Sequence, residues 1–129
     1  MKPCRSCATL SYLTPAQQVI AHRMLEKDLS QAVFDMARDY GWLAARYPTW
    51  RPTGTAAGVP DLLLVRAGEE IIFAELKNQH GKFTTAQDEW ANALKGIAEG
   101  RILYFTWRPS HLLGGAIEAV LAWEPRAGA

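Results

Sequence analysis

Cysteine is scarce in this sequence of 129 residues: only Cys4 and Cys7 occur, and they form a single C-x-x-C pattern. The chain is long enough to bury a core without disulfides or metal staples. A structural zinc site needs four ligands, and His22 is the only nearby candidate for a third. We interpret the pattern as part of a reduced N-terminal tail. The alternative is a zinc ion shared between two chains, with two cysteines from each.

Long apolar runs are also missing. No stretch of the sequence reaches the length that spans a bilayer, and the N-terminus lacks the apolar region of a signal peptide. We therefore expect no membrane association and an intracellular, cytoplasmic location, in the host cytoplasm if the protein is viral.

The sequence has no excess of one charge, since its net charge is +1. The first 23 residues contain three basic residues and no acid, so the remainder has 11 basic and 13 acidic residues, a net −2. Proteins that bind nucleic acid usually show a basic excess. A cluster of acids that binds cations would offset part of this mismatch, because the metal supplies positive charge at the site.

The length and the 49% hydrophobic content are those of one globular domain, which we place at residues 24–129 after an N-terminal extension of residues 1–23. Thr14, Pro15 and Gln17 predict a capped helix start. The helical pattern runs from there to Tyr40, and Gly41 follows as a typical helix-ending residue.

Four apolar runs between turn signals predict strands at residues 42–47, 61–66, 71–77 and 102–107, with a surface loop at 48–59. Thr84 is expected to cap a second helix that runs to about Glu99 and ends at Gly100. Ser110 is expected to cap a last helix ending near Trp123. The predicted order is α-β-β-β-α-β-α.

Two acids and a lysine stand at the ends of the second and third predicted strands. Side chains alternate along a strand, so Glu75 and Lys77 share a face. The two strands form a hairpin, which places Asp61, at the start of one, beside Glu75, at the end of the other. Two carboxylates and the Leu76 carbonyl would provide hard oxygen ligands for Mg²⁺ or Mn²⁺.

A metal ion held there would polarise a scissile phosphate and lower the pKa of a bound water. Lys77 would orient or deprotonate that water, or neutralise charge in the transition state. Glu-x-Lys alone also fits a salt-bridged strand end. The preceding Gly58-Val59-Pro60-Asp61, at a distance compatible with a hairpin, favours the site.

Two further polar residues have two interpretations each. Glu26 lies about 40° from the centre of an apolar helical stripe, taking about 100° per residue. It is either a further metal ligand, direct or through water, or a carboxylate favoured by the dipole at a helix start. Gln87 is the N3 residue of the capping box with Thr84, and it could also bond a phosphate or a metal-bound water.

Taken in order, several segments resemble the virus-type replication-repair nuclease (VRR-NUC) domain, a branch of the PD-(D/E)xK superfamily. The resemblance covers about residues 24–120. The segments that carry it are Leu25-Glu26-Lys27-Asp28-Leu29-Ser30-Gln31, Gly41-Trp42, Gly58-Val59-Pro60-Asp61-Leu62-Leu63, Ala74-Glu75-Leu76-Lys77 and Gln87-Asp88-Glu89-Trp90.

The resemblance implies an α/β fold with a restriction-endonuclease-like core, in which a central mixed sheet is flanked by helices. It implies Asp61 and Glu75 as metal ligands, Lys77 as the catalytic lysine, Glu26 as an additional acidic ligand and Gln87 as a later polar residue of the motif.

Stand-alone members of this kind resemble junction-resolving enzymes that act as homodimers on branched DNA, and larger relatives act on flaps. The implied function is therefore a Mg²⁺- or Mn²⁺-dependent, structure-selective DNA endonuclease of repair, recombination or replication. One alternative is a non-catalytic DNA-binding or assembly module with the same fold, and another is a nuclease for a different nucleic acid.

Four basic residues in or beside predicted loops are candidate phosphate contacts: Arg46, Arg51, Lys82 and Arg108.

Overall fold

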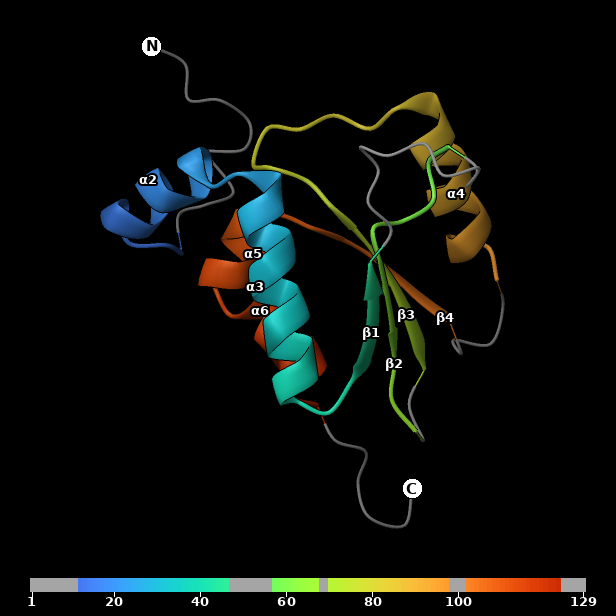
Figure 1. Cartoon of the computed structure of the whole chain (residues 1–129). Helices are drawn as coiled ribbons and strands as arrows, with labels where there is room; N and C mark the ends of the chain where they lie inside the picture. Colours follow the sequence, from blue (N-terminus) through green and yellow to red (C-terminus); the bar gives the residue numbers. More distant parts are fainter. Residues whose placement is uncertain (1–11, 47–56, 68–69, 98–101, 124–129) are drawn as a thin grey trace.

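The computed structural model describes residues 12–46, 57–67, 70–97 and 102–123 as one four-stranded mixed sheet with helices on both faces (Figure 1). The sheet order is β1-β2-β3-β4. The first two pairings are antiparallel and the third is parallel. The elements are α2 (Pro15–Arg23), α3 (Glu26–Asp39), β1 (Leu43–Arg46), β2 (Leu62–Val65), β3 (Ile71–Leu76), α4 (Thr85–Lys95), β4 (Ile102–Trp107), α5 (Pro109–Leu113) and α6 (Ala116–Leu121).

The main core lies between the sheet and the helices α3, α5 and α6, whereas α4 lies on the opposite side of the sheet (Figure 1). Apolar side chains at every second strand position point into this core, as the pleat of a strand requires. Its fully buried members include Leu29, Leu64, Ile72, Leu76 and Leu121. The mixed α/β sheet flanked by helices agrees with the expected fold class. None of the described helices is long and apolar enough to cross a membrane.

The expected single helix between Thr14 and Tyr40 is wrong, because Met24 and Leu25 adopt extended backbone angles and separate α2 from α3. The two helices pack mainly against different partners. Ala21 of α2 packs with Leu13 and Leu113, beside α5, whereas α3 packs on the sheet and α6. A single straight helix could not make both sets of contacts, so packing overrides a helical pattern that contains no Pro or Gly after Pro15.

Three other features of the helices differ from the expectation. Helix α4 ends at Lys95 with Gly96 as its C-cap, before the expected end at Gly100. The last helix is two short ones, because Gly115 has a φ of +87°, outside the right-handed helical region. Arg108, not Ser110, is the N-cap of α5. By contrast, β4 spans the expected residues, and Gly41 follows α3 with a φ of +86°.

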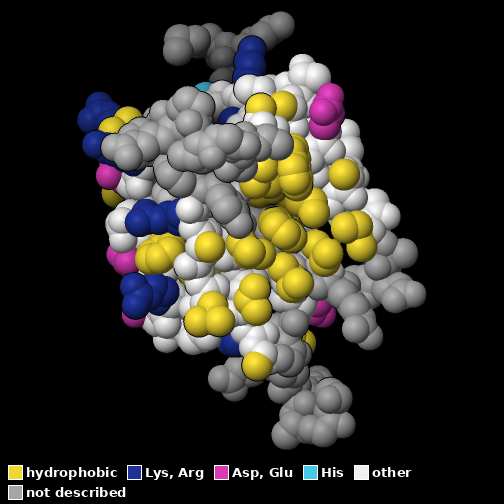
Figure 2. All heavy atoms as spheres, turned by 45° about the vertical axis from the view of Figure 1, so that its right-hand side comes forward, with side chains coloured by type: hydrophobic (Ala, Val, Ile, Leu, Met, Phe, Trp, Pro, Cys, Tyr) yellow, Lys and Arg dark blue, Asp and Glu magenta, His cyan; other side chains and the backbone are white. Residues whose placement is uncertain are grey.

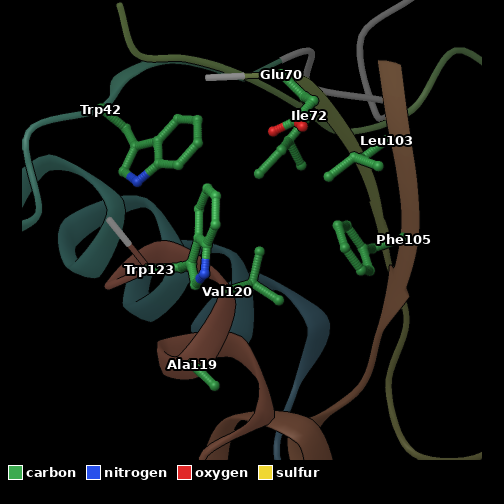
Figure 3. Close-up of a pocket in the computed structure, with 8 residues that line it drawn as sticks. All are labelled: Trp42, Glu70, Ile72, Leu103, Phe105, Ala119, Val120 and Trp123. Carbon is green, nitrogen blue, oxygen red and sulfur yellow. The ribbon is translucent and has the colours of Figure 1, made fainter. Parts of the chain in front are cut away.

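One apolar pocket of about 280 Å³ lies between α6 and the edge of the sheet formed by β3 and β4 (Figure 3). Ile72, Leu103 and Phe105 line it from the sheet, and Val120 and Trp123 line it from the opposite wall. Ile72 is on the face of β3 opposite to Glu75, because side chains alternate along a strand. The pocket and the polar cluster described below therefore lie on different faces of the sheet.

Candidate functional site

The carboxylate of Asp61 is fixed at the end of β3. The register pairs Leu62 with Ala74, which places Asp61 opposite Glu75, one position before the first residue of β2. Asp61 Oδ2 accepts a hydrogen bond of 2.8 Å from the Leu76 N–H. In a strand the N–H and C=O of one residue point to the same side. The Leu76 carbonyl therefore faces the same side of β3 as Asp61.

Gln87 joins the acid and the lysine of β3. Its Nε2 donates to Glu75 Oε1 at 2.8 Å, and its Oε1 accepts from Lys77 Nζ at 2.7 Å. The same Oε1 also accepts from the Thr84 N–H at 2.9 Å, and Thr84 Oγ1 accepts from the Gln87 N–H. The capping role and the site role expected for Gln87 are therefore compatible in one conformation.

The lysine and the acids of the cluster are all buried. Glu75 is only 1% exposed, Lys77 is 7% exposed and Asp61 is 8% exposed. Lys77 Nζ lies 3.9 Å from Glu75 Oε1 and 5.5 Å from the centre of the Phe83 ring. One ammonium group thus faces two buried carboxylates. Negative charge is therefore in excess in a low-dielectric environment.

Burial, together with the neighbouring charges, changes the acidity of both carboxyl groups. Burial raises the pKa of Asp61 to about 6, against the opposing hydrogen bond from the Leu76 N–H. Burial, followed by the charge of Asp61, raises the pKa of Glu75 to about 8. Lys77 lowers both values without reversing either shift. A cation close to both oxygens would remove this penalty.

Glu26 belongs to the same electrostatic group although it comes from another element. It is the first residue of α3, half-buried, and its charge raises the pKa of both Asp61 and Glu75. Its place at the helix start agrees with the dipole interpretation and still lets the carboxylate act on the site. Both interpretations of Glu26 stay open.

The donor set fits a hard divalent cation: two carboxylates fixed by hydrogen bonds, and a backbone carbonyl on the same side. Among the described residues, no three His, Cys, Asp or Glu side chains lie close enough together to hold a metal ion. Asp61, Glu75 and the Leu76 carbonyl could therefore hold Mg²⁺ or Mn²⁺ only together with water or substrate oxygens, and Glu26 would act at longer range. Both cysteines of the chain lie outside the described residues.

Gly58 lies in the loop before Asp61, at a position where the backbone approaches α4 too closely for any other residue. Its φ is +86°, and a Cβ at this position would overlap the backbone carbonyl of Ala86 and lie 2.7 Å from the Gln87 nitrogen. Only glycine permits this approach, which holds the segment before Asp61 against the first turn of α4. The motif thus positions Asp61 relative to Gln87 through backbone contact.

The candidate DNA contacts lie in different settings. Arg46 donates to Gln31 Oε1 and lies over the Phe34 ring, beside α3. Arg108 donates to the carbonyls of Asn78 and Gly81, at 2.8 and 2.9 Å, and so holds the loop after β3. Lys82 is exposed in that loop, and Arg51 lies outside the described residues. Phosphate contact by these residues stays a prediction.

Sequence reasoning did not single out two structural side chains. Arg66 donates to the carbonyls of Tyr40, Leu121 and Trp123 and stacks over Trp42, so it joins the ends of α3 and α6. The buried Gln79 accepts from the Ser110 N–H and joins the loop after β3 to α5. Neither residue has a local sequence signal, because the partners are distant in the chain.

No protein-family model, curated protein or solved structure matches this chain.

Proposed function

We propose that this protein is a Mg²⁺- or Mn²⁺-dependent DNA endonuclease of the VRR-NUC type, with a restriction-endonuclease-like core. The observation that supports the proposal best is the polar cluster at the end of β3. Asp61 is held by the Leu76 N–H, and Gln87 joins Glu75 to Lys77. Two buried carboxylates beside one lysine lower the stability of the folded protein, because their negative charge is not fully compensated. A bound cation would compensate that charge and remove the penalty.

Each residue has a defined task in this proposal. Asp61, Glu75 and the Leu76 carbonyl would hold the metal ion, and Glu26 would act on it at longer range through water. The ion would polarise the scissile phosphate and lower the pKa of a bound water. Gln87 fixes Lys77 Nζ by one of its three hydrogens, so the others can donate to a phosphate oxygen or to the attacking water.

Branched DNA as the substrate and a homodimer as the active form are further parts of the proposal. One small site cuts one strand, so symmetric cleavage of a junction requires two copies. Three large hydrophobic residues are exposed on the strands that the structure describes: Leu43 is 74% exposed, Val65 37% and Ile71 38%. Figure 2, in which the side with α4 and β4 comes forward, shows hydrophobic side chains gathered on that face. An apolar surface of this kind fits a self-complementary dimer contact.

The test is to incubate the protein with Mg²⁺ or Mn²⁺ and labelled linear, flap and four-way DNAs, with single-stranded RNA as a separate arm. We expect metal-dependent cleavage of a branched DNA, and at least about a 100-fold loss in Asp61→Asn, Glu75→Gln and Lys77→Met. Full activity in all three variants would refute the proposal. Metal-independent binding of branched DNA without cleavage would instead favour a non-catalytic module, and cleavage of RNA alone would favour another substrate class.

A further inference from the structure

The loop of residues 77–84 joins β3 to α4 (Figure 1), and it folds back along its own first side chain, that of Lys77. A Cβ at Gly81 would lie 3.3 Å from Lys77 Cδ and 3.0 Å from Asn78 Oδ1, so glycine lets the loop approach the stem of the lysine. At the other end of the side chain, Lys77 Nζ lies 5.5 Å from the centre of the Phe83 ring. The loop thus contacts Lys77 at both its stem and its ammonium group.

Helix α5 holds this loop from outside. Arg108, the N-cap of α5, donates to two carbonyls of the loop at 2.8 and 2.9 Å. The buried Gln79 accepts from the Ser110 N–H at 3.1 Å. Polar groups that lose such partners inside a protein are costly, so these bonds favour one conformation of the loop. They therefore give Phe83, which lies near the end of the loop, a defined place beside Lys77.

The start of α4 does not by itself account for an aromatic residue at Phe83. Phe83 precedes the N-cap Thr84, where an apolar side chain often packs against an apolar residue at N4. In α4 the N4 residue is Asp88, an exposed acid, so this pair is missing. Phe83 is half-buried, and it belongs to neither apolar cluster of the described residues. Its contact with the Lys77 ammonium is therefore what distinguishes this position.

A ring face beside an ammonium group restricts where that group can lie. The face of an aromatic ring attracts a cation within about 6 Å of its centre. A lysine side chain otherwise has many rotamers, and ordering it in advance reduces the entropy lost when it acts on a substrate. We propose that Phe83 is a positioning residue that, together with Gln87, holds Lys77 Nζ in place for the nuclease reaction, a role that rests on the proposed function.

Two substitutions separate the ring face from apolar bulk. Phe83→Leu keeps an apolar side chain and removes the ring, whereas Phe83→Tyr keeps the ring. With branched DNA at saturating Mn²⁺, we expect Phe83→Leu to lower kcat at least about tenfold with KM changed less than about threefold, and Phe83→Tyr to keep at least about half of the wild-type kcat. The control is Phe105→Leu, the same change at a half-buried position on the opposite face of the sheet, which should keep the wild-type kcat. Wild-type kcat in Phe83→Leu, or an equal loss in Phe83→Tyr, would overturn the proposal.

A second measurement needs neither metal nor cleavage. The full chain is labelled with an amine-reactive reagent, and mass spectrometry of its peptides gives the rate at Lys77, which is only 7% exposed. We expect Phe83→Ala to raise that rate at least about fivefold, because loss of the ring opens the ammonium to the reagent. The exposed Lys95 is the internal reference, and Phe105→Leu should leave both rates unchanged. An unchanged rate at Lys77 in Phe83→Ala would overturn the proposal. A raised rate in a protein whose wild type cleaves no nucleic acid would support the placement of Lys77 by Phe83 and refute the nuclease function instead.

Discussion

The Gln87 side chain caps α4 and also bonds Glu75 and Lys77. A second glutamine, Gln17, allows the capping role to be measured on its own. Gln17 occupies the same position in the capping box of α2, with Thr14 in place of Thr84. Beyond the cap, the Gln17 Nε2 donates to the Leu113 carbonyl of α5, whereas Gln87 bonds Glu75 and Lys77 of the cluster. The two residues therefore form a matched pair for substitution.

We predict that Gln87→Ala and Gln17→Ala each cost about 1 kcal/mol of unfolding free energy through the lost cap. Only Gln87→Ala should also lower metal-dependent cleavage, by about 10-fold or more, because it releases Lys77 Nζ. Thermal unfolding and cleavage rates at one metal concentration give both numbers. Equal cleavage rates in the two variants would assign Gln87 to capping alone.

Glu75 makes the stability of the metal-free protein depend on pH. Its pKa rises from 4.5 to about 8 on folding, and that of Asp61 rises from 3.8 to about 6. The folded chain therefore binds more protons than the unfolded chain in this range, so stability falls as pH rises from about 4 to about 8. The loss is complete above the folded pKa and absent below the unfolded one.

Glu75→Gln should remove most of this dependence. We predict that its melting temperature equals that of the wild type near pH 4 and exceeds it by about 4 °C or more near pH 8. Added Mn²⁺ should stabilise the wild type near pH 8 and leave the variant unchanged. The exposed Glu89→Gln serves as control and should follow the wild type at both pH values. A pH-independent difference between Glu75→Gln and wild type would contradict the assignment.

At the scale of elements, the loop before β2 depends on one close backbone contact. Gly58 and Gly41 share a φ of +86°, but only Gly58 has neighbours at the place where a Cβ would lie. Gly41→Ala therefore measures the strain of positive φ alone, and Gly58→Ala adds the overlap with α4.

We predict a cost of about 1 kcal/mol for Gly41→Ala and about 3 kcal/mol or more for Gly58→Ala. Gly58→Ala should also reduce cleavage, because it moves Asp61 away from Gln87. Urea unfolding and activity of both variants provide the comparison. If the two variants lose equal stability and keep full activity, the contact does not position the site.

The elements that follow local rules could be predicted from the sequence. Thr14 and Thr84 cap helices as their motifs indicate, and β4 has the expected bounds. The break at Met24 and Leu25 could not be predicted, since it depends on α2 packing against α5. The same holds for Arg66 and Gly58, whose partners are brought near by the fold. In the cluster, strand alternation and hairpin geometry were sufficient to bring Asp61, Glu75 and Lys77 together, and the capping box placed Gln87.

At the scale of the whole molecule, the proposed dimer can be tested without touching the site. Leu43→Glu places a charge on the most exposed hydrophobic side chain of the sheet. We predict that light scattering with four-way DNA shows dimers for the wild type and predominantly monomers for Leu43→Glu. Leu25→Glu is the control, since Leu25 is 55% exposed at the junction of α2 and α3. A monomeric wild type on junction DNA would contradict the dimer.

Cleavage of a labelled four-way junction by the wild type and by Glu75→Gln, over a Mn²⁺ titration, tests most directly whether the buried acids serve metal-dependent DNA hydrolysis. Gln17→Ala is included as a variant with an altered cap and an intact site. We predict saturable cleavage by wild type and Gln17→Ala, and at least about a 100-fold lower rate for Glu75→Gln at every metal concentration. Equal rates for all three proteins, or no cleavage by the wild type of any branched DNA at saturating Mn²⁺, would contradict the proposed function.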